Sequence, residues 1–385
     1  MILYIILFLL FFILSYLALG KNLPLLPFFL VFFIFLLYLL FLLEIYPVST
    51  DLTYGSDARY YYDSVISSIK GYTNCENFHA PFYVCAMEHV LSLSPDTGHY
   101  HFVMFNLSLL LFSCMLVAYS LNKLYKLTLN EKLLIVFLLL NPIILWAGLR
   151  GLKEPLIMFG FSLIFYSLVK AETNKSFLYL FLPIVVVVFD FIKPLGGFFV
   201  LLSIFISYIS FRYGFLKVFI SCFLGYLLVT FAVSVLIDNN PLFYRFLAHR
   251  DNYESINQLV PSTLDYFTAP LRFILGPGPI RSLQQIMFGD VFVVSSVVGD
   301  FLIFFGSLFW WGGLFYLFIC SINRGLSLST LKFPIVFSIF FSMVYILSYS
   351  VIYLGTGDTR HRAIIYFTLA PSFVILCRRA FYACK

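Results

Sequence analysis

The sequence predicts an all-α fold: a polytopic transmembrane helical bundle of about eleven spans, forming one integral membrane domain over residues 1–385. Hydrophobic residues make up 62% of the chain and charged residues only 11%, whereas a soluble domain carries about 25% charged residues. The mean hydropathy is +0.99. This composition excludes a soluble enzyme, and continuous apolar runs of about 20 residues argue against a transmembrane barrel.

The predicted spans follow these apolar runs. They lie near 1–19, 24–44, 102–121, 133–149, 155–169, 177–192, 195–211, 215–237, 291–320, 333–353 and 363–377. The first run has no basic stretch before it and no small-residue cleavage site, so we expect a retained span and not a signal peptide. Two longer connections, 45–101 and 238–290, are predicted outer loops, and the second is expected to hold short amphipathic helices.

The charges predict which side of the membrane each connection faces. One set of connections, with the C-terminal tail, carries many cations but only the acids Glu131 and Glu172. Its cations are Lys21, Lys123, Lys126, Lys132, Lys170, Lys175, Arg212, Lys217, Arg324, Lys332, Arg378, Arg379 and Lys385. Because cytoplasmic loops carry an excess of Lys and Arg, the N-terminus is predicted outside and the C-terminus in the cytoplasm. The predicted topology thus explains why Lys and Arg outnumber Asp and Glu, and no nucleic acid is expected as a partner.

Chemistry is expected on the outer side, where both long loops and all six histidines fall. The inner connections are short and hold no glycine-rich phosphate loop. Cys75 and Cys85 are the cysteines of the outer loops, and they form either a disulfide or two free thiols. No Cys and His spacing typical of a metal site is present, so no metal ligand is predicted.

The first candidate cluster follows the second predicted span. Acids recur there at Asp51, Asp57 and Asp63, among them Arg59 and Tyr60. One interpretation is an interfacial helix with tyrosines at the headgroup level and acids in water. The other is a sugar-binding site in which aromatic faces stack on sugar rings and Asp57 removes a proton.

The second cluster connects two spans with almost no loop between them. Arg150 and Glu154 are four residues apart and could pair on one helical face, while Pro155 suits a first helical turn. The helix N-terminus, Arg150 and Lys153 would together bind an anion. The alternative is a tight turn with a compensating ion pair.

The third cluster lies in the last outer loop and opens the final span. It contains Asp358, Arg360, His361 and Arg362. Arginines bind phosphate oxygens in bidentate fashion, and Asp358 is near enough in sequence to orient one of them. The alternative is a set of side chains that anchor the helix at the membrane surface.

The fourth cluster is the second long loop, with Arg250, Arg272 and Arg281 near a Gly-Pro repeat at 276–279. It indicates either a basic groove or an ordinary solvated loop. Asp190 and Lys193, three residues apart, are predicted to form a structural pair. Cations from three elements and an acidic, tyrosine-rich loop on one face fit an anionic, lipid-linked sugar substrate.

The sequence resembles bacterial O-antigen and capsule repeat-unit polymerases, within the GT-C-type membrane glycosyltransferases. The resemblance rests on the general architecture, on an acid soon after the second span, and on two short motifs. The motifs are Leu149-Arg150-Gly151-Leu152-Lys153-Glu154 and Gly357-Asp358-Thr359-Arg360-His361-Arg362. It implies a GT-C-like fold in the bacterial inner membrane and polymerisation of undecaprenyl-pyrophosphate-linked repeat units on the extracytoplasmic face, in O-antigen (lipopolysaccharide) or capsule polysaccharide biosynthesis.

The resemblance also implies roles for the candidate residues. Arg150, Arg360 and Arg362 would stabilise the lipid pyrophosphate as it leaves, with Arg272 or Arg281 assisting. Asp57 is the first candidate base, followed by Glu154 and His361. Substrate binding would fall to Arg59, Tyr60, Lys153, Arg250, Arg272, Arg281 and Asp358. No cofactor or metal is required, and the expected partners are the lipid-linked glycans, membrane lipids and a chain-length regulator.

Two other functions fit parts of the pattern. A GT-C transferase that uses a polyprenyl-monophosphate sugar would depend on an acid in its first outer loop, which is where Asp57 lies. A flippase or transporter of lipid-linked sugars would place charges near the bilayer midplane and show related halves. The charges here gather at one face, and no convincing repeat is present.

Overall fold

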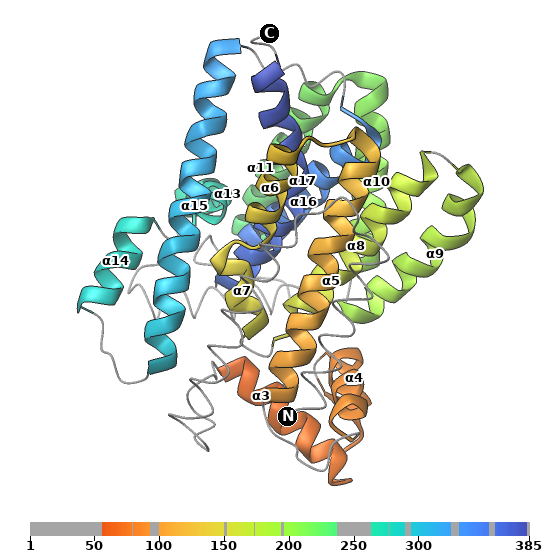
Figure 1. Cartoon of the computed structure of the whole chain (residues 1–385), viewed down its shortest axis with the longest axis vertical. Coiled ribbons are helices and arrows are strands. Elements are labelled where there is room, and N and C mark those ends of the chain that lie inside the picture. The colour runs from red at the N-terminus through yellow and green to blue at the C-terminus, as the bar shows by residue number, and fades with distance from the viewer. Residues whose placement is uncertain are drawn as a thin grey trace.

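The computed structural model describes residues 56–78, 80–92, 100–149, 152–172, 174–193, 196–236, 263–276, 278–288, 294–324, 331–353 and 359–382. Every regular element in these ranges is a helix (Figure 1). The elements are α3 (Ser56–Ile69), η1 (Cys75–Asn77), α4 (Pro81–Ser92), α5 (Tyr100–Tyr125), α6 (Leu129–Leu139), α7 (Pro142–Leu149), α8 (Glu154–Ala171), α9 (Lys175–Ile192), α10 (Gly196–Tyr213), α11 (Phe215–Leu236), α13 (Thr263–Leu275), α14 (Pro279–Phe288), α15 (Val294–Arg324), α16 (Phe333–Tyr353) and α17 (Thr359–Tyr382).

The described helices confirm a helical protein with spans of membrane length. Five stretches are long and apolar enough to cross a bilayer: Phe105–Tyr125, Glu154–Ala171, Gly196–Tyr213, Gly299–Phe318 and Phe333–Ser350. α9 and α11 contribute shorter apolar stretches, Leu182–Ile192 and Phe215–Leu228. The predicted spans 1–19 and 24–44 lie outside the described residues, so the total of about eleven stays a prediction.

The predicted span 133–149 is built from two helices, α6 and α7, with a bend between them. α6 and α7 meet at an angle of 44°. Pro142 lacks the N–H that would continue the hydrogen bonds of α6. The Asn141 side chain makes hydrogen bonds at this break. Its amide donates to the Gly306 carbonyl at 3.1 Å, and its oxygen accepts from the Ile143 N–H at 2.9 Å. Glycine at 306 permits this approach, because a Cβ there would lie 2.6 Å from the Asn141 oxygen.

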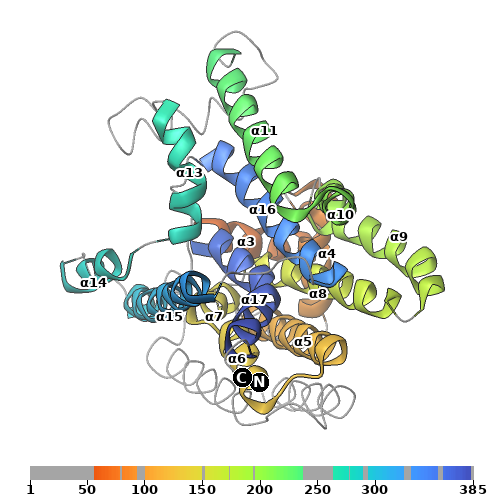
Figure 2. The ribbon, with the colours of Figure 1, turned by 90° about the horizontal axis from the view of Figure 1, so that it is seen from above.

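α17 is the central helix of the bundle and packs against α6, α7, α8, α15 and α16 (Figure 2). Its Phe367 meets Phe161 of α8 edge to face, with ring centroids 6.1 Å apart. Lipid is as apolar as these side chains, so close packing and interhelical hydrogen bonds hold such helices together. The Ser342 and Thr368 hydroxyls supply one such bond at 2.7 Å, between α16 and α17.

Glycine allows the closest helix contacts in the half of the bundle that contains α8, α9 and α10. Gly160 of α8 and Gly196 of α10 both face the ring of Phe189 on α9. A Cβ at Gly160 would lie 2.3 Å from that ring, so a larger residue would push α8 and α9 apart. This contact fixes the end of α9 relative to the start of α8, where the candidate site lies.

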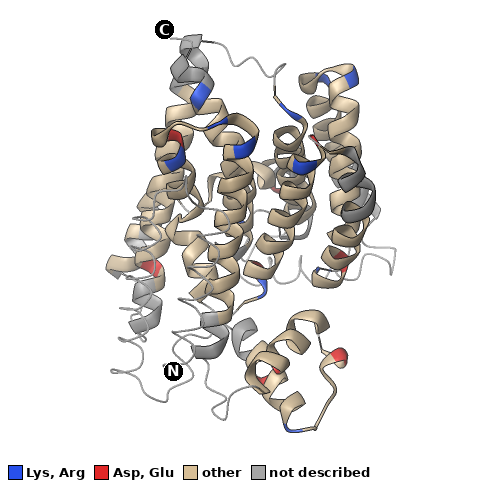
Figure 3. Ribbon diagram, turned by 45° about the vertical axis from the view of Figure 1, so that its right-hand side comes forward, with Lys and Arg blue, Asp and Glu red and all other residues tan. Residues whose placement is uncertain are grey.

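The bundle has two different ends, which we call the capped end and the C-terminal end. The capped end is covered by α3, η1 and α4, and α4 packs on α5 and α9 (Figure 1). A disulfide between Cys75 and Cys85 joins η1 to α4. The C-terminal end holds the end of α17 and many of the described Lys and Arg residues (Figure 3). Which end faces the cytoplasm stays a prediction.

Candidate functional site

The start of α8 places a lysine and a glutamate at the capped end. Lys153 precedes the helix and Glu154 is its first residue, with exposed fractions of 9% and 1%. Pro155 suits the first turn because its fixed φ is already helical. The backbone N–H groups of Leu156 and Ile157 both bond to the Lys153 carbonyl. The N–H groups of Leu156 and Ile157 are thus already engaged, and the Lys153 side chain brings a positive charge to this helix end.

Lys153 faces the helices that cover this end. Its Nζ lies 5.6 Å from the centroid of the Tyr61 ring on α3, a cation–π contact. Burial lowers the pKa of Lys153 to about 8; the charge of Lys193 lowers it further and that of Glu154 opposes the shift. The two lysines and the carboxylate therefore share one electrostatic environment.

Lys193 contributes to this environment from a second helix end, one residue beyond the end of α9. Its Nζ lies 4.8 Å from the ring centroid of Tyr349 on α16. Burial lowers the pKa of Lys193, while Glu154 acts in the opposite direction. The predicted structural pair of Asp190 with Lys193 is wrong. The turn into α10 brings the Gly197 N–H within 3.1 Å of the Asp190 carboxylate, which accepts its hydrogen bond, while the lysine lies over the tyrosine ring.

His361, in the first turn of α17, is held by two tyrosines of α16. Its Nδ1 is 2.9 Å from the Tyr345 hydroxyl. The Tyr349 ring lies 4.4 Å, between centroids, from both the His361 and the Tyr345 rings. All three residues are buried, with exposed fractions of 6% or less. Tyr349 thus joins the histidine on one side to Lys193 on the other.

Arg362 points in another direction, because successive helical residues are rotated by about 100°. It is 8% exposed and faces the C-terminal end of α13 at Gly276. Gly276 has a φ of +69°, and a Cβ there would lie 2.7 Å from the Tyr366 hydroxyl and 3.4 Å from Arg362 Cδ. The Trp310 ring stacks on Tyr366 at 4.0 Å, and its N–H donates to the Ile274 carbonyl. α13 and α15 therefore form the wall beside the arginine.

The covering helices are tied to the start of α8 by a polar contact. The Asn106 amide of α5 donates to the Leu152 carbonyl at 2.8 Å and to the Tyr83 hydroxyl of α4 at 3.0 Å. Tyr83 meets Tyr61 edge to face at 5.3 Å. Burial raises the pKa of both phenols well above the ordinary value, and the Glu154 charge adds to this. Both tyrosines therefore stay neutral and can donate hydrogen bonds.

An apolar cavity of about 370 Å³ lies beside the same helix ends, between α11, α13, α16 and α17. Ile346 and Leu347 line it between the two site tyrosines of α16, and Ile274 lines it two residues before Gly276. It continues along α16 as far as Ile339, about 12 Å deeper at 1.5 Å of rise per residue. The helices that carry His361 and the wall of Arg362 therefore also line an apolar recess.

The structure brings four of the predicted site residues to this end: Lys153, Glu154, His361 and Arg362. It places Asp57 and Arg59 on α3, Arg281 on α14 and Arg360 on α17, but describes only their backbone. Arg150, Arg250 and Asp358 lie outside the described residues.

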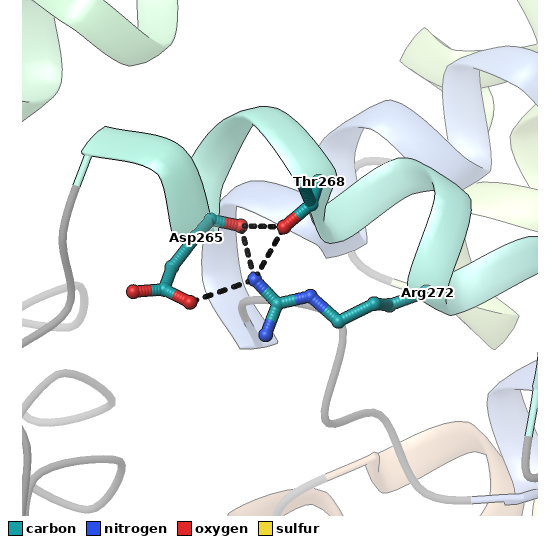
Figure 4. A network of polar contacts seen from close by, with 3 residues as sticks. All are labelled: Asp265, Thr268 and Arg272. Carbon is teal, nitrogen blue, oxygen red and sulfur yellow. Dashed lines mark hydrogen bonds and ion pairs between the residues drawn. The ribbon is translucent and has the colours of Figure 1, made fainter.

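Two other predicted binding residues are described: Arg272 lies apart from this cluster, and Tyr60 lies beside it, with its ring centroid 5.6 Å from that of Tyr61. Arg272 bonds back along its own helix to Asp265 at 2.9 Å and to Thr268 at 2.7 Å, away from Gly276 (Figure 4). It therefore does not extend the group of cations around Arg362. Tyr60 is 43% exposed on α3, where its ring meets Phe78 edge to face.

Sequence reasoning missed Lys193 as a site residue, together with four polar residues of the surrounding wall, Tyr61, Tyr83, Tyr345 and Tyr349. The spacing of Tyr345 and Tyr349 by four residues near the end of a predicted span was the available signal for that pair. Lys193 carried a misleading signal, because its spacing from Asp190 matched a local ion pair.

Neither protein-family models, nor curated proteins, nor solved structures match this chain. Among the described residues, no group of three or more His, Cys, Asp or Glu side chains is arranged to hold a metal ion. The described part of the site offers ammonium, guanidinium, carboxylate, imidazole and phenol groups.

Proposed function

We propose that this chain is a membrane glycosyltransferase that polymerises polyprenyl-pyrophosphate-linked oligosaccharide repeat units, as in O-antigen or capsule synthesis. One observation carries the proposal: the helices that hold the buried His361 and Arg362 and their wall, α13, α16 and α17, also line an apolar cavity of about 370 Å³. An anionic lipid needs both surfaces, one for its phosphates and one for its tail. The tyrosine-rich helices over this end add polar and aromatic groups of the kind that bind sugars.

In this reaction the hydroxyl of an acceptor sugar attacks the anomeric carbon of the donor. A new glycosidic bond forms, the bond to the lipid pyrophosphate breaks, and the pyrophosphate leaves with its negative charge. Fixed cations in a site that excludes water stabilise that charge more strongly than they would in bulk solvent. Lys153 and Arg362, both at most 9% exposed, are suited to this role.

The acceptor hydroxyl must also lose a proton. Of the candidate bases, Glu154 and His361 have described side chains in the cluster, while Asp57 is placed by its backbone alone. The Tyr345 hydroxyl engages His361 at Nδ1, which fixes the orientation of the imidazole ring. The negative charge of Glu154 raises the pKa of both lysines. In this reaction Glu154 would keep the lysines charged as well as accept a proton.

Deletion of the gene tests the proposal. Surface polysaccharide from the deletion strain, separated on a gel, is expected to show acceptor carrying at most one repeat unit, because single units are still made but not joined. A plasmid with the intact gene should restore the ladder. A normal ladder in the deletion strain would contradict the proposal.

A further inference from the structure

Two lysines at the capped end, Lys153 and Lys193, lie near aromatic rings. Among the described residues, neither Lys153 nor Lys193 forms an ion pair. Lys153 is 9% exposed and Lys193 is partly buried, and the charge of Lys193 acts on Lys153. Two like charges withdrawn from water repel each other and lose hydration, so this arrangement is costly in the unliganded protein.

The contacts of both lysines keep their charge available. Each ammonium faces an aromatic ring, Tyr61 at 5.6 Å for Lys153 and Tyr349 at 4.8 Å for Lys193. A cation–π contact stabilises the charge without neutralising it. The two rings come from different helices, α3 and α16. Glu154 is the acid whose charge acts on both, which leaves a net positive charge.

A lipid snorkelling role does not account for Lys193. A lysine just beyond a helix end ordinarily extends toward the lipid headgroups. This one lies over a residue of α16 that is 6% exposed, in contact with the buried imidazole of His361. An uncharged sugar would not repay the burial of a second like charge, whereas a phosphate group with two negative charges would.

We infer that Lys193 and Lys153 form a subsite for a phosphoryl anion, with one lysine on each side of the bound phosphate. The identity of that anion as the pyrophosphate of a lipid-linked glycan rests on the proposed function. The subsite itself predicts binding of inorganic pyrophosphate as well as of a prenyl pyrophosphate.

The inference is tested by ligand binding to the purified full-length protein in detergent. The probes are inorganic pyrophosphate, geranylgeranyl pyrophosphate and the uncharged geranylgeraniol. Calorimetry should show binding of both pyrophosphates, tighter for the prenyl compound if the apolar cavity takes its tail. Lys193→Met should weaken binding of both pyrophosphates by about tenfold or more, the effect of about 1.4 kcal/mol or more.

Two further variants keep the result interpretable. Lys193→Arg, which keeps the charge, should retain most of the affinity. Lys217→Met removes an exposed lysine in the first turn of α11 and should bind as the intact protein does. If Lys193→Met elutes as an aggregate, Lys193→Gln replaces it in the comparison. Pyrophosphate should then bind more weakly to Lys193→Gln than to Lys193→Arg, and equal affinities would contradict the inference.

Equal binding by the intact protein and the methionine variant would overturn the inference, and so would equal binding of geranylgeraniol and its pyrophosphate. The gene-deletion experiment reports separately on the proposed function. A normal polysaccharide ladder together with Lys193-dependent pyrophosphate binding would refute the polymerase and leave the anion subsite standing.

Discussion

The two ends of the bundle use the same charged residue types in different ways. At the C-terminal end, Arg378 lies 3.4 Å from Glu131 and donates to the Tyr125 carbonyl at 2.7 Å. Lys332 donates to the Leu124 carbonyl at 2.9 Å. These charges fasten the ends of α5, α6, α16 and α17 to one another. At the capped end, Lys153 and Lys193 lie over aromatic rings, as Lys332 also does over Tyr125, but among the described residues neither of the two ammonium groups donates to a carbonyl.

The difference separates structural charges from those available to a ligand. A cation that donates to a helix C-terminal carbonyl satisfies an acceptor that would otherwise be orphaned, and so stabilises the fold. A cation held against an aromatic ring in a buried position satisfies no such group. In the proposed site, the binding of an anion would repay the cost of that burial.

The largest expected effect is on activity, from two matched glutamates. Glu154→Gln should reduce polymerisation by at least about 100-fold, because the carboxylate beside the lysines is lost while the size of the side chain is kept. Glu131→Gln, in a similarly buried position at the other end, should keep activity within about threefold. The measurement is the polysaccharide ladder in the complemented deletion strain, normalised to the amount of protein in the membrane.

A short ladder with Glu131→Gln and a normal one with Glu154→Gln would reverse the assignment of the two ends. Equal loss of polymerisation in both variants, at equal protein levels, would show that the comparison does not distinguish a functional carboxylate from a structural one.

The second prediction concerns stability and has opposite signs at the two ends. The pKa of Lys153 is about 8 in the folded protein, below the ordinary lysine value, so the charged form is disfavoured by folding. That cost is fully present below pH 8 and disappears as the pH rises from 8 toward the ordinary lysine pKa. Lys153→Met should therefore raise the free energy of unfolding at pH 7 by about 2 kcal/mol, and by much less near pH 10.

The matched change at the C-terminal end is Arg378→Met. It removes the contacts to Glu131 and to the Tyr125 carbonyl and should lower stability by about 1–2 kcal/mol. Thermal unfolding of the detergent-solubilised variants measures both effects. A loss of stability in Lys153→Met at pH 7 would show that the lysine is a structural charge like Arg378.

The third and smallest effect compares two glycines with positive φ. Gly276 (+69°) and Gly214 (+94°) would both be strained by a side chain, at a cost of about 1–2 kcal/mol. A Cβ at Gly276 would also lie 2.7 Å from the Tyr366 hydroxyl, whereas nothing lies within 4 Å of one at Gly214. Gly276→Ala should therefore lower the unfolding temperature more than Gly214→Ala and reduce activity by displacing Arg362. Equal effects of the two changes on both quantities would remove Gly276 from the wall of the site.

The membrane helices were the most predictable part of the molecule, because composition and run length alone indicate them. The bend at Asn141 was not anticipated, although the Asn-Pro pair at 141–142 marks a helix break. The bend depends on Gly306, which lies far along the chain and contacts the asparagine only in the folded bundle.

The candidate site was predictable where charges stand at the ends of apolar runs, as with Lys153, Glu154, His361 and Arg362. Lys193 was assigned to a local pair because spacing within one helix is visible in a sequence, and a contact with Tyr349 of a distant helix is not. For Arg272 the prediction failed in the opposite direction. It was grouped with distant arginines but bonds to Asp265 of its own helix.

The most direct measurement is the reaction itself, with lipid-linked single repeat units extracted from the deletion strain and added to the purified protein. We expect glycans of several repeat units to form, with one lipid pyrophosphate released for each bond made, and Glu154→Gln to form none. Substrate that stays at one repeat unit with the intact, folded protein would contradict the assignment of the capped end as a polymerase site.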